Sequence, residues 1–118
     1  MKRILSALVL VMVLAGSAFS LSDREYKRMR KESKVFRDAD KKLSQVWSRI
    51  KSKITRPAES AFEMLKAEQR EWIEYERDKA AEKYMTRGHA RDEAYALATN
   101  KRIEELEEWE EYMFSEEE

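Results

Sequence analysis

The chain has 118 residues, with 24 lysines and arginines, 24 aspartates and glutamates, two glycines, one proline and no cysteine. This length allows one domain, and so few glycines and prolines exclude an all-β fold with many tight turns. The lack of cysteine excludes disulfides and a thiol nucleophile, and a single histidine excludes a metal site with two imidazoles from one chain. The abundance of strong helix formers therefore predicts an all-α protein.

Residues 1–20 have the pattern of a signal peptide. A basic start and an apolar stretch over residues 4–14 precede Ala18-Phe19-Ser20, which has the small-x-small pattern of a signal peptidase site. We predict cleavage after Ser20, so that the mature protein is exported to the periplasm or the extracellular medium and has no stable membrane anchor. An uncleaved anchor is the alternative, because residues 4–21 are just long enough to span a bilayer.

A first helix is predicted from a capping box, in which Ser22 and Glu25 satisfy free amides at a helix start. Apolar residues then recur at steps of three and four as far as Ile54, as one helical face requires. This apolar stripe is thin over residues 26–36. We therefore expect the packed part to begin near Val35 and the first turns to be frayed or to project beyond the bundle.

Two further helices follow. Pro57 interrupts the first pattern, and a second helix is predicted over residues 58–85. We expect Gly88 to end it in a left-handed conformation and Asp92 to cap a third helix, which runs into the acidic tail. The sequence thus predicts an elongated bundle of three amphipathic helices over residues 21–118, with large aromatic side chains in the core. The alternative is a long hairpin that completes its core in a dimer.

Charge is divided unevenly along the chain. From Arg24 to Arg56 basic residues outnumber acidic ones by thirteen to four, whereas Glu104 to Glu118 holds nine glutamates and no basic residue. We expect the first and last helices to lie side by side and to neutralise each other. No nucleic-acid partner is expected, because an exported protein with this acidic counterweight lacks a free basic surface.

Residues suited to catalysis are absent or isolated. The chain has no Glu-x-x-His pair and no glycine-rich phosphate loop, and pairs such as Glu71 and Glu74 are expected at helical spacing without any function. We therefore expect no enzymatic activity, no metal and no other cofactor. His89, beside Gly88, is expected in an exposed loop, and contact with a protein partner is its second interpretation.

Three segments follow one another along the chain: ADKKLSQVW (residues 39–47), LKAEQREWIEY (65–75) and TNKRIEEL (99–106). In this order they resemble the LprI-type lysozyme inhibitor family. The residues that match the family pattern are Asp40, Leu43, Gln69, Arg70, Trp72, Tyr75, Thr99, Arg102 and Leu106. The resemblance covers about residues 36–110, and it implies a small, exported, helical domain.

The chain departs from this family at a pair of cysteines. The resemblance places them near Ala80 or Ala81 and near Ala94 or Ala96, which implies a cysteine-free variant. The family also carries an Arg-Asp pair after the tryptophan segment. Its places are occupied by Glu76 and Arg77, or the pair is shifted to Arg77-Asp78.

The resemblance and the acidic end of the chain together predict a non-catalytic protein that binds and occludes a lysozyme-like muramidase. C-type lysozymes are strongly basic, so Glu107, Glu108 and Glu111 are expected to attract and contact such a partner. The alternative is a structural or accessory helical protein of the cell envelope. It would self-associate, for instance as a head-to-tail homodimer, or pair with a partner helix.

Overall fold

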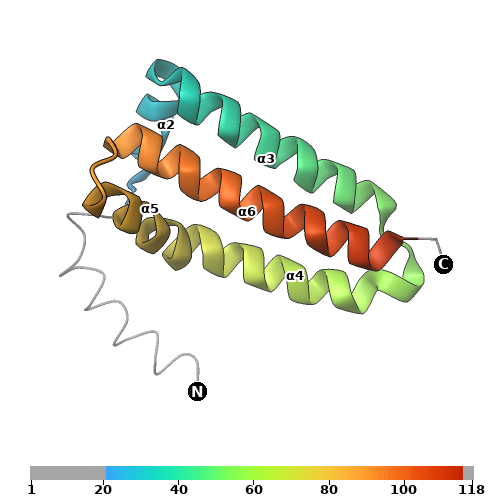
Figure 1. The fold of residues 1–118 in the computed structure, drawn as a ribbon. Helices are drawn as coiled ribbons and strands as arrows, with labels where there is room; N and C mark the ends of the chain where they lie inside the picture. Colours follow the sequence, from blue (N-terminus) through green and yellow to red (C-terminus); the bar gives the residue numbers. More distant parts are fainter. Residues whose placement is uncertain (1–20, 116–118) are drawn as a thin grey trace.

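The computed structural model describes residues 21–115, which are helical with no strand among them (Figure 1). The α-helices are α2 (Asp23–Glu32), α3 (Lys34–Lys53), α4 (Glu59–Glu71), α5 (Arg77–Thr86) and α6 (Arg91–Phe114). A 3-10 turn, η1 (Arg56–Ala58), leads into α4, and a π-helical turn, η2 (Trp72–Glu76), joins α4 to α5 in one continuous rod. The predicted signal peptide lies outside the described residues. None of the described helices is long and apolar enough to cross a membrane.

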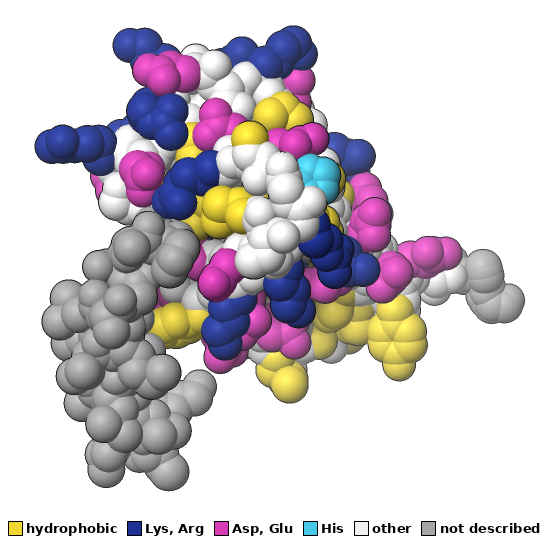
Figure 2. Space-filling view, turned by 60° about the vertical axis from the view of Figure 1, so that its left-hand side comes forward, with side chains coloured by type: hydrophobic (Ala, Val, Ile, Leu, Met, Phe, Trp, Pro, Cys, Tyr) yellow, Lys and Arg dark blue, Asp and Glu magenta, His cyan; other side chains and the backbone are white. Residues whose placement is uncertain are grey.

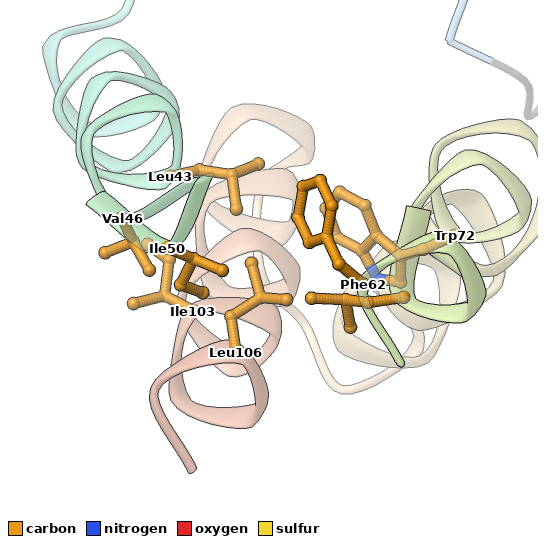
Figure 3. Packing of buried hydrophobic residues seen from close by; sticks show 8 residues of the cluster. Leu43, Val46, Ile50, Phe62, Trp72, Ile103 and Leu106 are labelled. Carbon is orange, nitrogen blue, oxygen red and sulfur yellow. The ribbon is translucent and has the colours of Figure 1, made fainter. Parts of the chain in front are cut away.

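Helix α6 is the centre of the domain. It lies between α3 on one side and the α4–α5 rod on the other, and α2 folds behind α3 at the end where α5 lies (Figure 1). The closest backbone packing joins α6 to α3 and α6 to α5. Helix α4 stands farther from its neighbours, and its long side chains bridge the space. Figure 3 shows Phe62 and Trp72 reaching from this rod toward Leu43 and Leu106.

The core of the described residues consists of two hydrophobic clusters. The first joins α3, α4 and α6, and its buried members are Leu43, Val46, Ile50, Phe62, Leu65, Trp72, Ile103 and Leu106 (Figure 3). The second lies where α2, α5 and α6 meet, and its buried members are Met29, Phe36, Ala81, Ala94, Tyr95 and Ala98. The expected all-α core of large aromatic and aliphatic side chains is therefore present.

Residues 21–115 form four helical rods, whereas the sequence predicted three, because Ser33 divides the first helix. The backbone of Ser33 is extended (φ −106°, ψ 110°), and its N–H closes α2 by donating to the Met29 carbonyl at 2.8 Å. Its hydroxyl then caps α3 by accepting from the Phe36 amide at 3.3 Å. The expected start of packing near Val35 is wrong. Met29 is fully buried, whereas Val35 is 49% exposed.

Two of the three predicted helix ends are confirmed. The Ser22 hydroxyl accepts from the Glu25 amide at 3.1 Å, and Gly88 ends α5 with φ 102°. The amide of Gly88 donates to Met85 and that of His89 to Tyr84, which is the pattern of a Schellman motif. The predicted cap at Asp92 is wrong. Helix α6 begins at Arg91, with Ala90 at the cap position, so Asp92 lies inside the first turn. There its carboxylate complements the helix dipole.

Candidate functional site

A groove of about 1180 Å³ lies between α3 and the α4–α5 rod, on the side where α4 stands away from α3. Residues 21–26 of the N-terminal segment contribute to one end of it, and no residue of α6 lines it. Five of the nine motif residues contribute to its lining: Asp40, Leu43, Gln69, Arg70 and Tyr75. Two segments that are distant in sequence, residues 39–47 and 65–75, thus place motif residues around one cavity, which makes this groove the candidate functional site.

Asp40 is buried at the α2 side of the groove. Its Oδ2 atom accepts a hydrogen bond from the Tyr26 hydroxyl at 2.7 Å and an ion-pair contact from Arg30 Nε at 2.8 Å. Burial, together with this hydrogen bond to a carboxylate, raises the pKa of Tyr26 to about 12. The Asp40 Oδ1 atom has no partner among residues 21–115. One carboxylate oxygen therefore ties α2 to α3, and the other remains free at the groove.

Gln69 is the buried polar residue on the opposite wall. Its Oε1 atom accepts from Arg102 Nε at 2.8 Å, and Arg102 is held in turn by Glu105 at 2.9 Å. Because an arginine side chain only donates, this contact fixes which way the Gln69 amide points. The amide nitrogen has no partner in the described part of the chain. Arg102 on α6 thus orients a free donor on α4.

Arg77 lies between two aromatic rings at the floor of the groove. Its guanidinium carbon is 5.7 Å from the ring centre of Tyr26 and 5.7 Å from that of Trp72, distances at which a cation is attracted to the ring face. The π-helical turn at Trp72–Glu76 begins at Trp72 and ends immediately before Arg77, so it sets the spacing of these two residues along the rod. Such turns frequently occur at functional sites.

Asp78 lies at the N-terminal end of the groove. It accepts from the Tyr95 hydroxyl at 2.5 Å and from the Leu21 backbone nitrogen at 3.2 Å. Burial, aided by the hydrogen bond to Asp78, raises the pKa of Tyr95 above its ordinary value. Arg77 and Asp78, which form the shifted placement of the family's Arg-Asp pair, both line the groove.

The other four motif residues support the site from behind. Trp72 and Leu106 belong to the first hydrophobic cluster. Thr99 is buried and donates to the Tyr95 carbonyl at 2.8 Å, and Arg102 positions Gln69. Of the alanines near the positions that the resemblance gives to the family's cysteines, Ala81 and Ala94 are fully buried in the second cluster.

The four predicted partner contacts do not form one site. His89 precedes α6, where its ring nitrogen is 3.0 Å from Glu93, whereas Glu107, Glu108 and Glu111 lie near the other end of that helix. Eighteen residues at 1.5 Å each separate His89 from Glu107 by about 27 Å. Glu107 contacts Arg49 at 3.5 Å, while Glu108 and Glu111 are exposed.

Glu110, which the sequence did not single out, is the main charge contact between α3 and α6. Its carboxylate accepts from Arg49 at 2.8 and 2.6 Å and from Lys53 at 2.8 Å. The hydrogen bonds from Arg49, followed by those from Lys53, lower the pKa of Glu110 to about 2. These contacts confirm the expectation that the basic and acidic helices lie side by side and neutralise each other.

The surface at the α2 and α5 end shows the same mixing of charge. In Figure 2, which faces this end, basic and acidic side chains alternate over the visible surface, and neither sign forms one large patch. Among the described residues no group of three or more histidine, cysteine, aspartate or glutamate side chains is placed to hold a metal ion.

These features define a small all-α domain whose motif residues surround an open groove. A family model described as lysozyme inhibitor LprI matches residues 22–106. This match spans most of the chain, and the chain belongs to the LprI lysozyme inhibitor family. The resemblance seen in the three sequence segments is therefore confirmed. No curated protein and no solved structure matches the chain.

Proposed function

We propose that this protein is exported and that it binds and occludes a lysozyme-like muramidase without any chemistry of its own. The family match over residues 22–106 carries this proposal. A family of inhibitors implies a protein partner, and an inhibitor that acts by occlusion needs a contact surface but no nucleophile, metal or cofactor. The groove is one such surface, and the acidic face of α6, which consists of Glu107, Glu108 and Glu111, is another. The two surfaces would have different roles.

The groove is the contact surface in this proposal. It presents an unpaired acceptor, Asp40 Oδ1, and an unpaired donor, the Gln69 amide, on side chains that are each more than nine-tenths buried. Ile73, which is 44% exposed, and the partly buried Trp47 add apolar surface. Aromatic side chains in well-packed, desolvated pockets are enriched among the residues that contribute most to protein binding.

The acidic face of α6 would act at longer range. Glu108 and Glu111 are exposed, and neither forms an ion pair within residues 21–115. Free carboxylates of this kind attract a basic partner and raise the rate of encounter, while adding little to the lifetime of the complex. Glu107 would contribute less, because Arg49 partly neutralises it.

A turbidity assay tests the proposal directly. The mature protein is added to a basic C-type lysozyme with a suspension of bacterial cells, and the rate of clearing is recorded against inhibitor concentration. We expect clearing to slow in a saturable manner. An unchanged rate at micromolar excess of the protein would overturn the proposal.

Self-association is supported less well. The head-to-tail homodimer relied on the basic first helix and the acidic last helix, but Arg49 and Lys53 already pair with Glu110 in the same chain. Light scattering at low and high salt separates the two functions. A salt-sensitive dimer that leaves lysozyme unaffected would favour the structural role over inhibition.

A further inference from the structure

The carboxylate of Asp78 has an unusual set of neighbours. It is partly buried, and it accepts hydrogen bonds from two groups that carry no charge in the full-length chain, the Tyr95 hydroxyl at 2.5 Å and the Leu21 backbone nitrogen at 3.2 Å. No lysine or arginine of residues 21–115 forms an ion pair with it. A desolvated carboxylate without a cation is costly unless a positive group reaches it.

Leu21 is the residue at which the predicted cleavage would create such a group. Hydrolysis adds water across the Ser20–Leu21 peptide bond, so that Ser20 keeps a carboxylate on the released peptide and Leu21 keeps an amine. That amine takes up a proton at neutral pH, because the ordinary pKa of an α-amino group is about 8. The nitrogen that would become charged is the one that already lies 3.2 Å from Asp78.

We propose that Asp78 is the binding site for the α-ammonium group of Leu21, so that removal of the signal peptide completes the N-terminal end of the groove. The proposal depends on cleavage after Ser20 and is independent of whether the protein inhibits a lysozyme. Processing would replace a neutral N–H donor by a charged one, and charge-assisted hydrogen bonds are roughly twice as strong as neutral ones.

The contact between Leu21 and Asp78 affects the groove because the N-terminal segment that it fixes forms part of the groove wall. Leu21, Ser22 and Tyr26 all line the groove, and Leu21 packs beside the second hydrophobic cluster. Tyr26 in turn donates to Asp40 and lies over Arg77. An ammonium group held by Asp78 therefore anchors the start of a chain of contacts that ends at the motif residue Asp40.

The pH dependence follows from the groups that surround Asp78. Tyr95 faces it from α6 and Arg91 lies over the Tyr95 ring, while Arg77 precedes it on α5. Burial and the hydrogen bond to Asp78 raise the pKa of Tyr95, so Tyr95 titrates only above its ordinary range. Pairing with Asp78 raises the pKa of the ammonium group. Its stabilising effect is therefore complete below about pH 8 and is lost as the pH rises through the value in the folded protein.

The test compares two forms of the mature chain. The full-length chain is first expressed in an exporting host, and the N-terminus of the exported protein is read by mass spectrometry. The chain that begins at Leu21 is then compared with a semisynthetic copy acetylated at that residue, which keeps the N–H donor and removes the charge. We expect the free ammonium to raise the melting temperature by about 4–8 °C near pH 6.5. This difference should disappear as the pH approaches about 10.

Two substitutions separate a specific contact from general charge. Asp78→Asn keeps an acceptor for Tyr95 and should abolish the difference between the free and acetylated chains. Asp23→Asn should preserve it, because Asp23 is exposed and its ion pair within residues 21–115 is with Lys27. Three results would overturn the proposal: an exported protein that begins at another residue, equal melting temperatures near pH 6.5, or a difference that persists in Asp78→Asn.

Discussion

The groove and the acidic end of α6 use charged and polar residues in opposite ways. Around the groove, Asp40 and Gln69 are buried, and each has one atom satisfied from within the fold and another left free. At the acidic end, Glu110 uses both carboxylate oxygens on Arg49 and Lys53. The carboxylate that joins α3 to α6 is therefore fully paired within the chain, whereas Asp40 and Gln69 each keep one free atom at the groove.

This difference also separates what stabilises the fold from what is available to a partner. A bidentate arginine–carboxylate contact between α3 and α6 fixes two helices, but its hydrogen bonds are already made within the chain. Free atoms on buried side chains have the opposite property. They contribute little to folding and offer directional contacts to a partner, as the following substitutions are designed to show.

The largest effect is expected from Arg102→Met. This change leaves Gln69 Oε1 buried without its donor, and an unsatisfied buried acceptor together with a lost charged hydrogen bond costs about 2–3 kcal/mol. Urea unfolding followed by tryptophan fluorescence measures the loss. Arg70→Met is the matched control at another arginine of the family motifs, and because Arg70 is exposed, it should change stability by less than about 0.5 kcal/mol. Similar losses in both variants would contradict a supporting role for Arg102.

Glu110→Gln is expected to lower the free energy of unfolding by about 1–2 kcal/mol at neutral pH. This loss is smaller than that of Arg102→Met because Arg49 and Lys53 are about half exposed and solvent screens their charges. Folding lowers the pKa of Glu110 from 4.5 to about 2. The unfolded chain therefore takes up the proton first as the pH falls, and the advantage of the wild type should shrink between pH 4.5 and 2.

Thermal unfolding across that pH range checks the sign of the Glu110 effect. Glu111→Gln, one residue further along α6, is the control and should leave the pH profile of the wild type unchanged, because Glu111 is exposed. If Glu110→Gln kept the full acid dependence of the wild type, the contacts with Arg49 and Lys53 would not be its source.

The sequence predicted well those features that depend on local chemistry. The cap at Ser22 and the left-handed stop at Gly88 follow from the conformational preferences of single residues. The pairing of α3 with α6 follows from charge blocks long enough that their exact register does not matter. The family was also identified correctly, because the order and spacing of its motifs can be read without a structure.

The groove could not be predicted because it depends on distances between helices. It exists because Phe62 and Trp72 hold α4 away from α3, and sequence periodicity says only that both side chains point inward. The break at Ser33 was missed for a similar reason. No glycine or proline marks it, and the burial of Met29 in the second cluster depends on contacts with α5 and α6 that the sequence pattern does not show. The contacts of Tyr26 with Asp40 and of Asp78 with Leu21 and Tyr95 were not predicted, because each joins different helices or segments.

Asp40→Asn in the groove is expected to lower the free energy of unfolding by about 1 kcal/mol. The variant loses the ion pair with half-exposed Arg30 and weakens the hydrogen bond from Tyr26. The pKa of Tyr26 should fall from about 12 toward 10, though not fully, since burial is its first cause. In the wild type, the stability that Tyr26 contributes is lost as the pH rises between these values. Ultraviolet titration of tyrosinate measures the shift, and Asp38→Asn on the exposed face of α3 should leave it unchanged.

The smallest effect on stability, below about 0.5 kcal/mol, is expected from the double variant Glu108→Gln/Glu111→Gln, because both side chains are exposed. Its effect on binding distinguishes the two regions. Association with a basic muramidase should slow by roughly 2–5-fold at low salt, with dissociation unchanged, since rim charges act mainly on encounter.

Ile73→Ser in the groove is the counterpart of that double variant. Ile73 is 44% exposed, so the fold should tolerate the change, but a lost apolar contact should speed dissociation at any salt concentration. Surface plasmon resonance at two salt concentrations separates the rates. At about 1 M salt, where charges are screened within about 3 Å, the double variant should match the wild type and Ile73→Ser should not. The reverse pattern would make the acidic face of α6, and not the groove, the surface that holds the partner.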